Sequence, residues 1–173
     1  MITESKPATD KMLASFSESI WKHFGAAIDM FENAVVMCPE EQWDKPQFWY
    51  KAFHASFWLD YYMTVNPEGF TPPPPFTTTE FDPAGKMPER KYTKEEVLGY
   101  VRASRKRLHE LMKNMNEESA LKHWINPDRN VTFFEMLLHN MRHLQHHTAQ
   151  LNLLLRQNIN NAPGWVEQTA MEL

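Results

Sequence analysis

The chain has 173 residues, of which 42% are hydrophobic and 23% are charged, and its formal net charge is −4 at pH 7. This length and composition are ordinary for a globular protein with its own core, so we expect one domain over residues 1–173. Because the balance is acidic and the lysines and arginines form no dense run, the sequence argues against nucleic-acid binding and against a polybasic membrane patch.

Cysteine content and apolar runs bear on the compartment. Cys38 is the only cysteine, which excludes an intrachain disulfide and is typical of a reducing environment. The N-terminal segment is polar, and no apolar run is long enough to cross a bilayer. We therefore expect neither a signal peptide nor a membrane-spanning helix, and we predict a cytoplasmic protein.

The first half of the chain predicts two long helices. Over residues 9–37 apolar side chains recur every three or four positions, which is the pattern of one core-facing stripe. The stripe consists of Leu13, Phe16, Ile20, Phe24, Ala27, Phe31 and Ala34. Over residues 47–64 aromatic side chains lie on nearly every side, so we expect this second helix to be buried around most of its circumference. Pro46 suits its first turn, where no N–H is needed.

A long connection over residues 65–91 follows. Prolines interrupt it repeatedly, including a run of four at residues 72–75, so it cannot be helical and is expected to be an extended crossover. Phe70, Phe76 and Phe81 favour a crossover that packs on the helices. The four prolines are also typical of a polyproline ligand for a partner domain.

The third predicted helix covers residues 93–115. Thr93 and Glu96 have the spacing of a capping box at its start. A short helical piece over residues 117–123 and a turn at residues 126–128 follow.

The fourth predicted helix runs over residues 132–158 and begins with a second capping-box spacing, from Thr132 to Glu135. The expected architecture is therefore an all-α, four-helix bundle with a long proline-rich crossover between helices 2 and 3.

Histidines gather in the fourth predicted helix, and one more lies in the second. Three of them are spaced one helical turn apart: His139, His143 and His147. Because an α-helix turns by about 100° per residue, these three share one face with His146 and Gln150. His54 lies in the aromatic second helix. Two imidazoles four residues apart and a third from a facing helix can hold a divalent metal ion and leave positions open, and burying them without partners would be costly.

The stretch from His143 to Gln150 resembles the C-terminal signature of the DinB-like (damage-inducible B, YfiT-type) superfamily. In that signature two histidines lie four residues apart and an arginine-glycine-glutamine-like tail follows. Thr148 and Ala149 depart from the usual arginine and glycine, which affects the polarity of the pocket and not the ligands. His54 matches the family's first metal ligand in position, and the long crossover also fits.

The resemblance implies that a zinc or nickel ion is held by His54, His143 and His147. Three imidazoles with an open position form a site of the catalytic kind. Spacing alone does not choose among zinc, nickel, copper and iron. The residues that act directly in catalysis are not indicated.

Four further residues are candidates at or near this site, and each has two interpretations. His139 is either a competing ligand or a group at the entrance. His146 either supports a ligand or lies on the surface, and Gln150 either orients a ligand or packs between helices. Asp60 is either an acceptor for an imidazole N–H or a solvated carboxylate. We expect the remaining histidines to be ordinary surface residues; these are His23, His109 and His123.

Members of the superfamily include thiol-dependent S-transferases, so the resemblance implies a small-molecule substrate and the transfer of a low-molecular-weight thiol to an electrophile. The same open position suits the activation of water for hydrolysis. One alternative is a non-catalytic metal-binding or stress-response protein, and another is an interaction module that uses the proline run. The resemblance also implies a homodimer.

Overall fold

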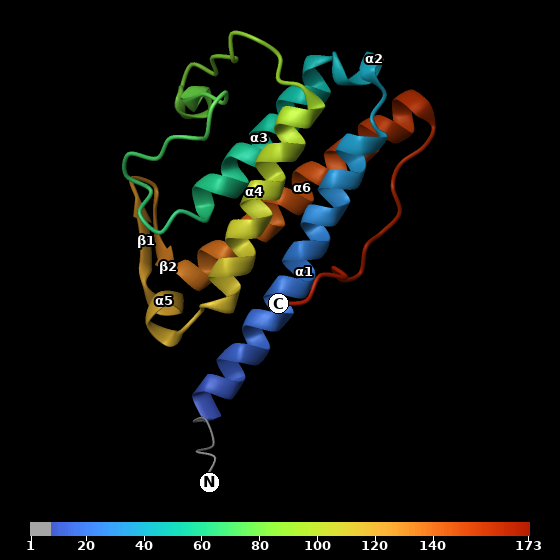
Figure 1. Ribbon diagram of the computed structural model, residues 1–173. Helices are drawn as coiled ribbons and strands as arrows, with labels where there is room; N and C mark the ends of the chain where they lie inside the picture. The colour runs from blue at the N-terminus through green and yellow to red at the C-terminus, as the bar shows by residue number, and fades with distance from the viewer. Residues whose placement is uncertain (1–7) are drawn as a thin grey trace.

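A computed structural model describes residues 8–173, and four long helices form its bundle (Figure 1). They are α1 (Ala8–Met37), α3 (Pro46–Tyr62), α4 (Lys94–Lys113) and α6 (Phe133–Ile159). Both α1 and α3 pack against α4 and α6. The predicted all-α bundle with a long crossover between its second and third long helices is confirmed. Residues 1–7, part of the polar segment for which we expect no signal peptide, lie outside the described residues.

The ends of the long helices follow the local sequence signals. Pro46 occupies the first turn of α3. The predicted capping box of α4 is present, because Thr93 Oγ1 accepts a hydrogen bond from Glu96 N–H and the Glu96 carboxylate accepts one from Thr93 N–H. At the start of α6 only half of the predicted box forms: Thr132 Oγ1 accepts from the N–H of Glu135 at 3.2 Å.

Five short elements connect the long helices. They are α2 (Glu40–Trp43), the 3₁₀ helix η1 (Thr78–Phe81), α5 (Glu117–Leu121), and the strands β1 (His123–Asn126) and β2 (Arg129–Thr132). The short helical piece at α5 is confirmed. The predicted turn at residues 126–128 is the tip of an antiparallel hairpin, in which Asn126 lies opposite Arg129. The sequence did not predict the hairpin, α2 or η1, because each is too short to establish a hydrophobic period.

The crossover packs against the bundle, as its phenylalanines predict. The ring of Phe76 is buried and stacks on Tyr100, with ring centroids 4.5 Å apart. Phe70 and Phe81 meet Phe57 of α3 edge to face, at 5.5 Å and 5.0 Å. This return of the chain to α3 brings η1 to the surface of the helix that carries His54.

The apolar stripe of α1 is buried only over its C-terminal part. Phe24 and Phe31 are fully buried, whereas Phe16 is 50% exposed because the N-terminal end of α1 extends beyond its neighbours (Figure 1). The C-terminal tail runs back along α1 (Figure 1), where Thr169 packs so closely that a Cβ at Gly25 would lie 2.5 Å from it. Among the described helices, none combines the length and apolar character that a bilayer crossing requires.

Candidate metal centre

The three histidines that the resemblance selects come together between α3 and α6. His54 projects from α3, and His143 and His147 project from successive turns of α6. One ring nitrogen of each lies within 4.8 Å of the others, and all three side chains are half-buried. Ring centroids are 4.5 Å apart for His54 and His147, 4.5 Å for His143 and His147, and 5.4 Å for His54 and His143.

The packing of α3 on α6 sets this arrangement. Leu144 and Leu151 are fully buried on the core side of α6. Asn140 is also fully buried, and its side-chain amide donates a 2.9 Å hydrogen bond to the backbone oxygen of Leu59 in α3. A buried polar group of this kind is satisfied only in one relative placement of the helices, so the bond restricts sliding of α6 along α3.

The spacing of the ring nitrogens suits a shared ion. The Nε2 atoms of His143 and His147 are 3.1 Å apart. Two imidazole nitrogens that bind one zinc ion in tetrahedral geometry lie about 3.3 Å apart. Without an ion the same distance accommodates a hydrogen bond between two neutral rings. The pair therefore needs little movement to become two ligands of one metal.

Glu80 of η1 holds the ring of His54. Its Oε2 atom lies 2.6 Å from His54 Nδ1 and accepts a 2.9 Å hydrogen bond from Trp58 Nε1. The Glu80 side chain is only 4% exposed. Burial by itself would raise the pKa of this carboxyl, but hydrogen bonds and the charge of His54 outweigh burial and lower it. A carboxylate at Nδ1 keeps the proton there, which leaves the Nε2 lone pair of His54 free for a metal.

Gln150 holds the ring of His147 in the same way. The Oε1 atom of Gln150 lies 3.0 Å from His147 Nδ1, and its amide nitrogen lies 2.9 Å from Nε2 of the exposed His146. The Gln150 side chain therefore contacts the rings of both His146 and His147, and its role in orienting a ligand stays a prediction. His146 supports that amide from the surface.

His139 and Asp60 lie outside the cluster. His139 Nε2 accepts a 3.1 Å hydrogen bond from Arg129, and its ring stacks on that of His143 with centroids 6.3 Å apart, while its role as an entrance group stays a prediction. Asp60 follows His54 by six residues, which is about 240° around the helix. It faces α4, where it is buried, accepts a hydrogen bond from Tyr100 and pairs with Arg107.

Both interpretations of Asp60 are therefore wrong. It touches no imidazole of the cluster, and it is not solvated. Glu80, and not Asp60, lies where an acceptor for the N–H of His54 was expected. No local pattern in the sequence indicated Glu80, because its contact with His54 depends on how the crossover folds back.

The remaining histidines are scattered. His23 and His123 are exposed, as expected. His109 is not an ordinary surface residue, because it is half-buried and packs edge-on against Trp21 with ring centroids 4.9 Å apart.

The burial of the cluster favours neutral imidazoles. Burial, reinforced by the charges of neighbouring histidines, lowers the pKa of His143 from the ordinary 6.5 to about 3. Burial and then the charge of His54 lower the pKa of His147 to about 4. Protons therefore compete weakly for these two rings near neutral pH, which is the state in which imidazole binds metals.

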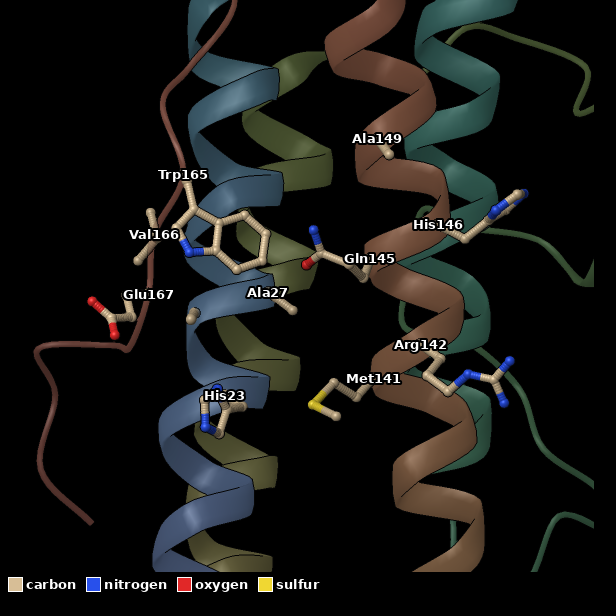
Figure 2. A pocket seen from close by; sticks show the side chains of 11 residues that line it. His23, Ala27, Met141, Arg142, Gln145, His146, Ala149, Trp165, Val166 and Glu167 are labelled. Carbon is tan, nitrogen blue, oxygen red and sulfur yellow. The ribbon is translucent and has the colours of Figure 1, made fainter.

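A separate cavity of about 470 Å³ lies between α1, α6 and the C-terminal tail (Figure 2). Met141 and Gln145 of α6 and Trp165 of the tail point into it, whereas the side chain of His146 points away (Figure 2). Although His146 is one of the residues that line this cavity, none of the three clustered histidines does.

The model of the DinB superfamily matches residues 23–151, which are more than half of the chain and include all three clustered histidines. No curated protein and no solved structure matches the chain significantly.

The lowered pKa values predict how stability depends on pH in the metal-free protein. The unfolded chain binds a proton at His143 below pH 6.5 and the folded chain does not until about pH 3, so stability falls as pH falls through this window. Through His143 alone, the free energy of unfolding should be about 2 kcal/mol lower at pH 5 than at pH 8. Urea unfolding of His143→Gln should show a pH dependence that is weaker by about that amount.

His23→Gln, at an exposed position of α1, is the matched control and should keep the wild-type pH dependence. Identical pH profiles for wild type and His143→Gln would contradict the buried neutral state of this ring.

Proposed function

The chain belongs to the DinB superfamily, and on this basis we propose that His54, His143 and His147 bind one divalent metal ion, either zinc or nickel. The observation that carries the proposal is the approach of three ring nitrogens, from two helices, to within 4.8 Å of one another. Three imidazole ligands leave a position open for a substrate. A bound ion would act there as a Lewis acid that lowers the pKa of a thiol or a water.

The surrounding residues support binding without closing the site. Glu80 and Gln150 orient two of the three rings through Nδ1. The three imidazoles are only half-buried, so a small molecule can reach them. Burial and then the neighbouring Glu80 raise the pKa of Tyr50 to about 12, so its hydroxyl stays protonated and can donate a hydrogen bond beside the site.

We propose that the substrate is a low-molecular-weight thiol that is transferred to an electrophile. The superfamily resemblance supports this assignment, and the open position supports hydrolysis of a small substrate as the second candidate. A non-catalytic metal-binding role is the alternative to both. The homodimer and the cytoplasmic location stay predictions.

Metal content tests the ligand set. Untagged protein loaded with zinc or nickel and then dialysed should retain one equivalent of metal by elemental analysis. His147→Ala should lose most of it, because two imidazoles remain. His139→Ala is the matched control on the same helix and should keep the metal, since His139 pairs with Arg129. Equal metal in the two variants would overturn the assignment.

The role of Glu80 predicts a smaller effect on affinity. Glu80→Gln should raise the dissociation constant of the metal by about 10- to 100-fold without changing the stoichiometry at saturation, because a neutral amide orients His54 and raises its basicity less well. Competition with a chromophoric chelator measures this change. Glu89→Gln, on the exposed part of the crossover, should leave the affinity unchanged. Equal affinities for both variants would remove Glu80 from the site.

Thiol transfer is tested directly with 1-chloro-2,4-dinitrobenzene and a panel of small thiols. The metal-loaded protein should accelerate conjugation above the uncatalysed rate, measured by absorbance. His143→Ala should abolish the acceleration, and His23→Ala, at an exposed position, should keep it. If no thiol reacts faster with fully loaded protein, the transfer proposal fails while metal binding stands.

A further inference from the structure

Arg129 lies at the edge of the histidine cluster. It begins β2, its Nη1 atom donates a 3.1 Å hydrogen bond to His139 Nε2, and its guanidinium carbon lies 5.5 Å from the ring centroid of Tyr62. The rings of His139 and Tyr62 in turn face His143, at centroid distances of 6.3 Å and 5.8 Å. One layer of aromatic rings therefore separates this cation from the candidate metal ligands.

The hairpin that carries Arg129 is firmly anchored. Trp124 of β1 is buried and donates a 2.9 Å hydrogen bond from Nε1 to the backbone oxygen of Thr64, just after α3. At the other end of the hairpin, the N–H of Phe133 donates to the backbone oxygen of Lys122 at 2.8 Å. Arg129 is thus held in place by the fold, and its side chain is half-buried.

No carboxylate of the described residues balances the positive charge of Arg129. Among the described residues its guanidinium contacts His139 and Tyr62, and no ion pair includes it. The atom that accepts from Arg129 is an imidazole nitrogen, which supplies no negative charge. The exposed Asp128, which directly precedes Arg129, does not pair with it.

Other charges near the site reinforce the imbalance. Arg142 directly precedes His143 in α6, and Lys51 precedes His54 by three residues in α3. The buried carboxylate of Glu80 is engaged by His54 and Trp58. A divalent ion at the histidines would add further positive charge, and like charges at this range repel each other. An anion that comes from outside the chain would therefore compensate the positive charge of Arg129 beside this site.

We propose that Arg129 binds a carboxylate of the small-molecule substrate while the reacting end of that substrate lies at the three histidines. The planar guanidinium suits a carboxylate because it offers two parallel N–H donors. This inference rests on the proposed metal-dependent function and narrows its substrate class to carboxylate-bearing molecules. It makes the β1–β2 hairpin the element that selects the substrate.

Matched pairs of acid and amide test the proposal on the zinc-loaded full chain. The probes are 3-mercaptopropionate against 3-mercaptopropionamide, and propionate against propionamide, with binding measured by isothermal titration calorimetry. We expect each acid to bind about 10- to 100-fold more tightly than its amide, as charge-assisted hydrogen bonds allow. In Arg129→Gln the tighter binding of the acid should disappear, except for the part that results from direct binding of the carboxylate to the metal. Arg129→Lys should keep part of the preference for the acid.

Arg156→Gln is the matched control, because Arg156 is exposed in the last turn of α6, and it should keep the full preference. Thermal melting of each variant verifies that it is folded. An acid preference that Arg129→Gln leaves unchanged, or no preference in the wild type, overturns the proposal. If propionate shows the Arg129-dependent preference but neither thiol binds more tightly than its thiol-free analogue, the carboxylate site stands and the thiol-transfer function fails.

Discussion

The packing of α3 against α6 is the constraint on which the functional architecture depends. It places one histidine of α3 opposite two histidines on successive turns of α6, so that their ring nitrogens converge. Buried leucines drive the contact, and the buried bond from Asn140 to the Leu59 backbone oxygen fixes its register. A shift of α6 by one residue would turn His143 and His147 by about 100° and separate them from His54.

The proline-rich crossover and the hairpin complete the site that the helices begin. The crossover brings Glu80 to His54, and the hairpin brings Arg129 to the next ring along, His139. The crossover contributes a carboxylate that contacts the candidate ligand His54, and the hairpin contributes a cation with no carboxylate partner among the described residues. The two connections thus place opposite charges on two sides of the histidine cluster, an arrangement suited to holding a cation and an anionic substrate together.

The helical periods and capping signals were sufficient to predict the bundle, the box at Thr93 and the shared face of His143 and His147. These features depend on residues that are close in sequence. Glu80 and Arg129 were not predicted, because their contacts arise only when the crossover and the hairpin return to the bundle. Asp60 was a candidate because it lies near His54 in sequence, but helix geometry turns it toward α4 and Tyr100. Helical spacing and the family resemblance therefore predicted which histidines lie together, and tertiary packing determined what surrounds them.

The central claim is that one metal ion is shared by imidazoles from α3 and α6. Anomalous diffraction from crystals of zinc-loaded protein, recorded on both sides of the zinc absorption edge, tests it most directly. We expect one strong peak bounded by Nε2 of His54, His143 and His147, with Nδ1 of His54 still in contact with Glu80. A zinc peak elsewhere, or no peak between these rings in crystals of fully loaded protein, would contradict it.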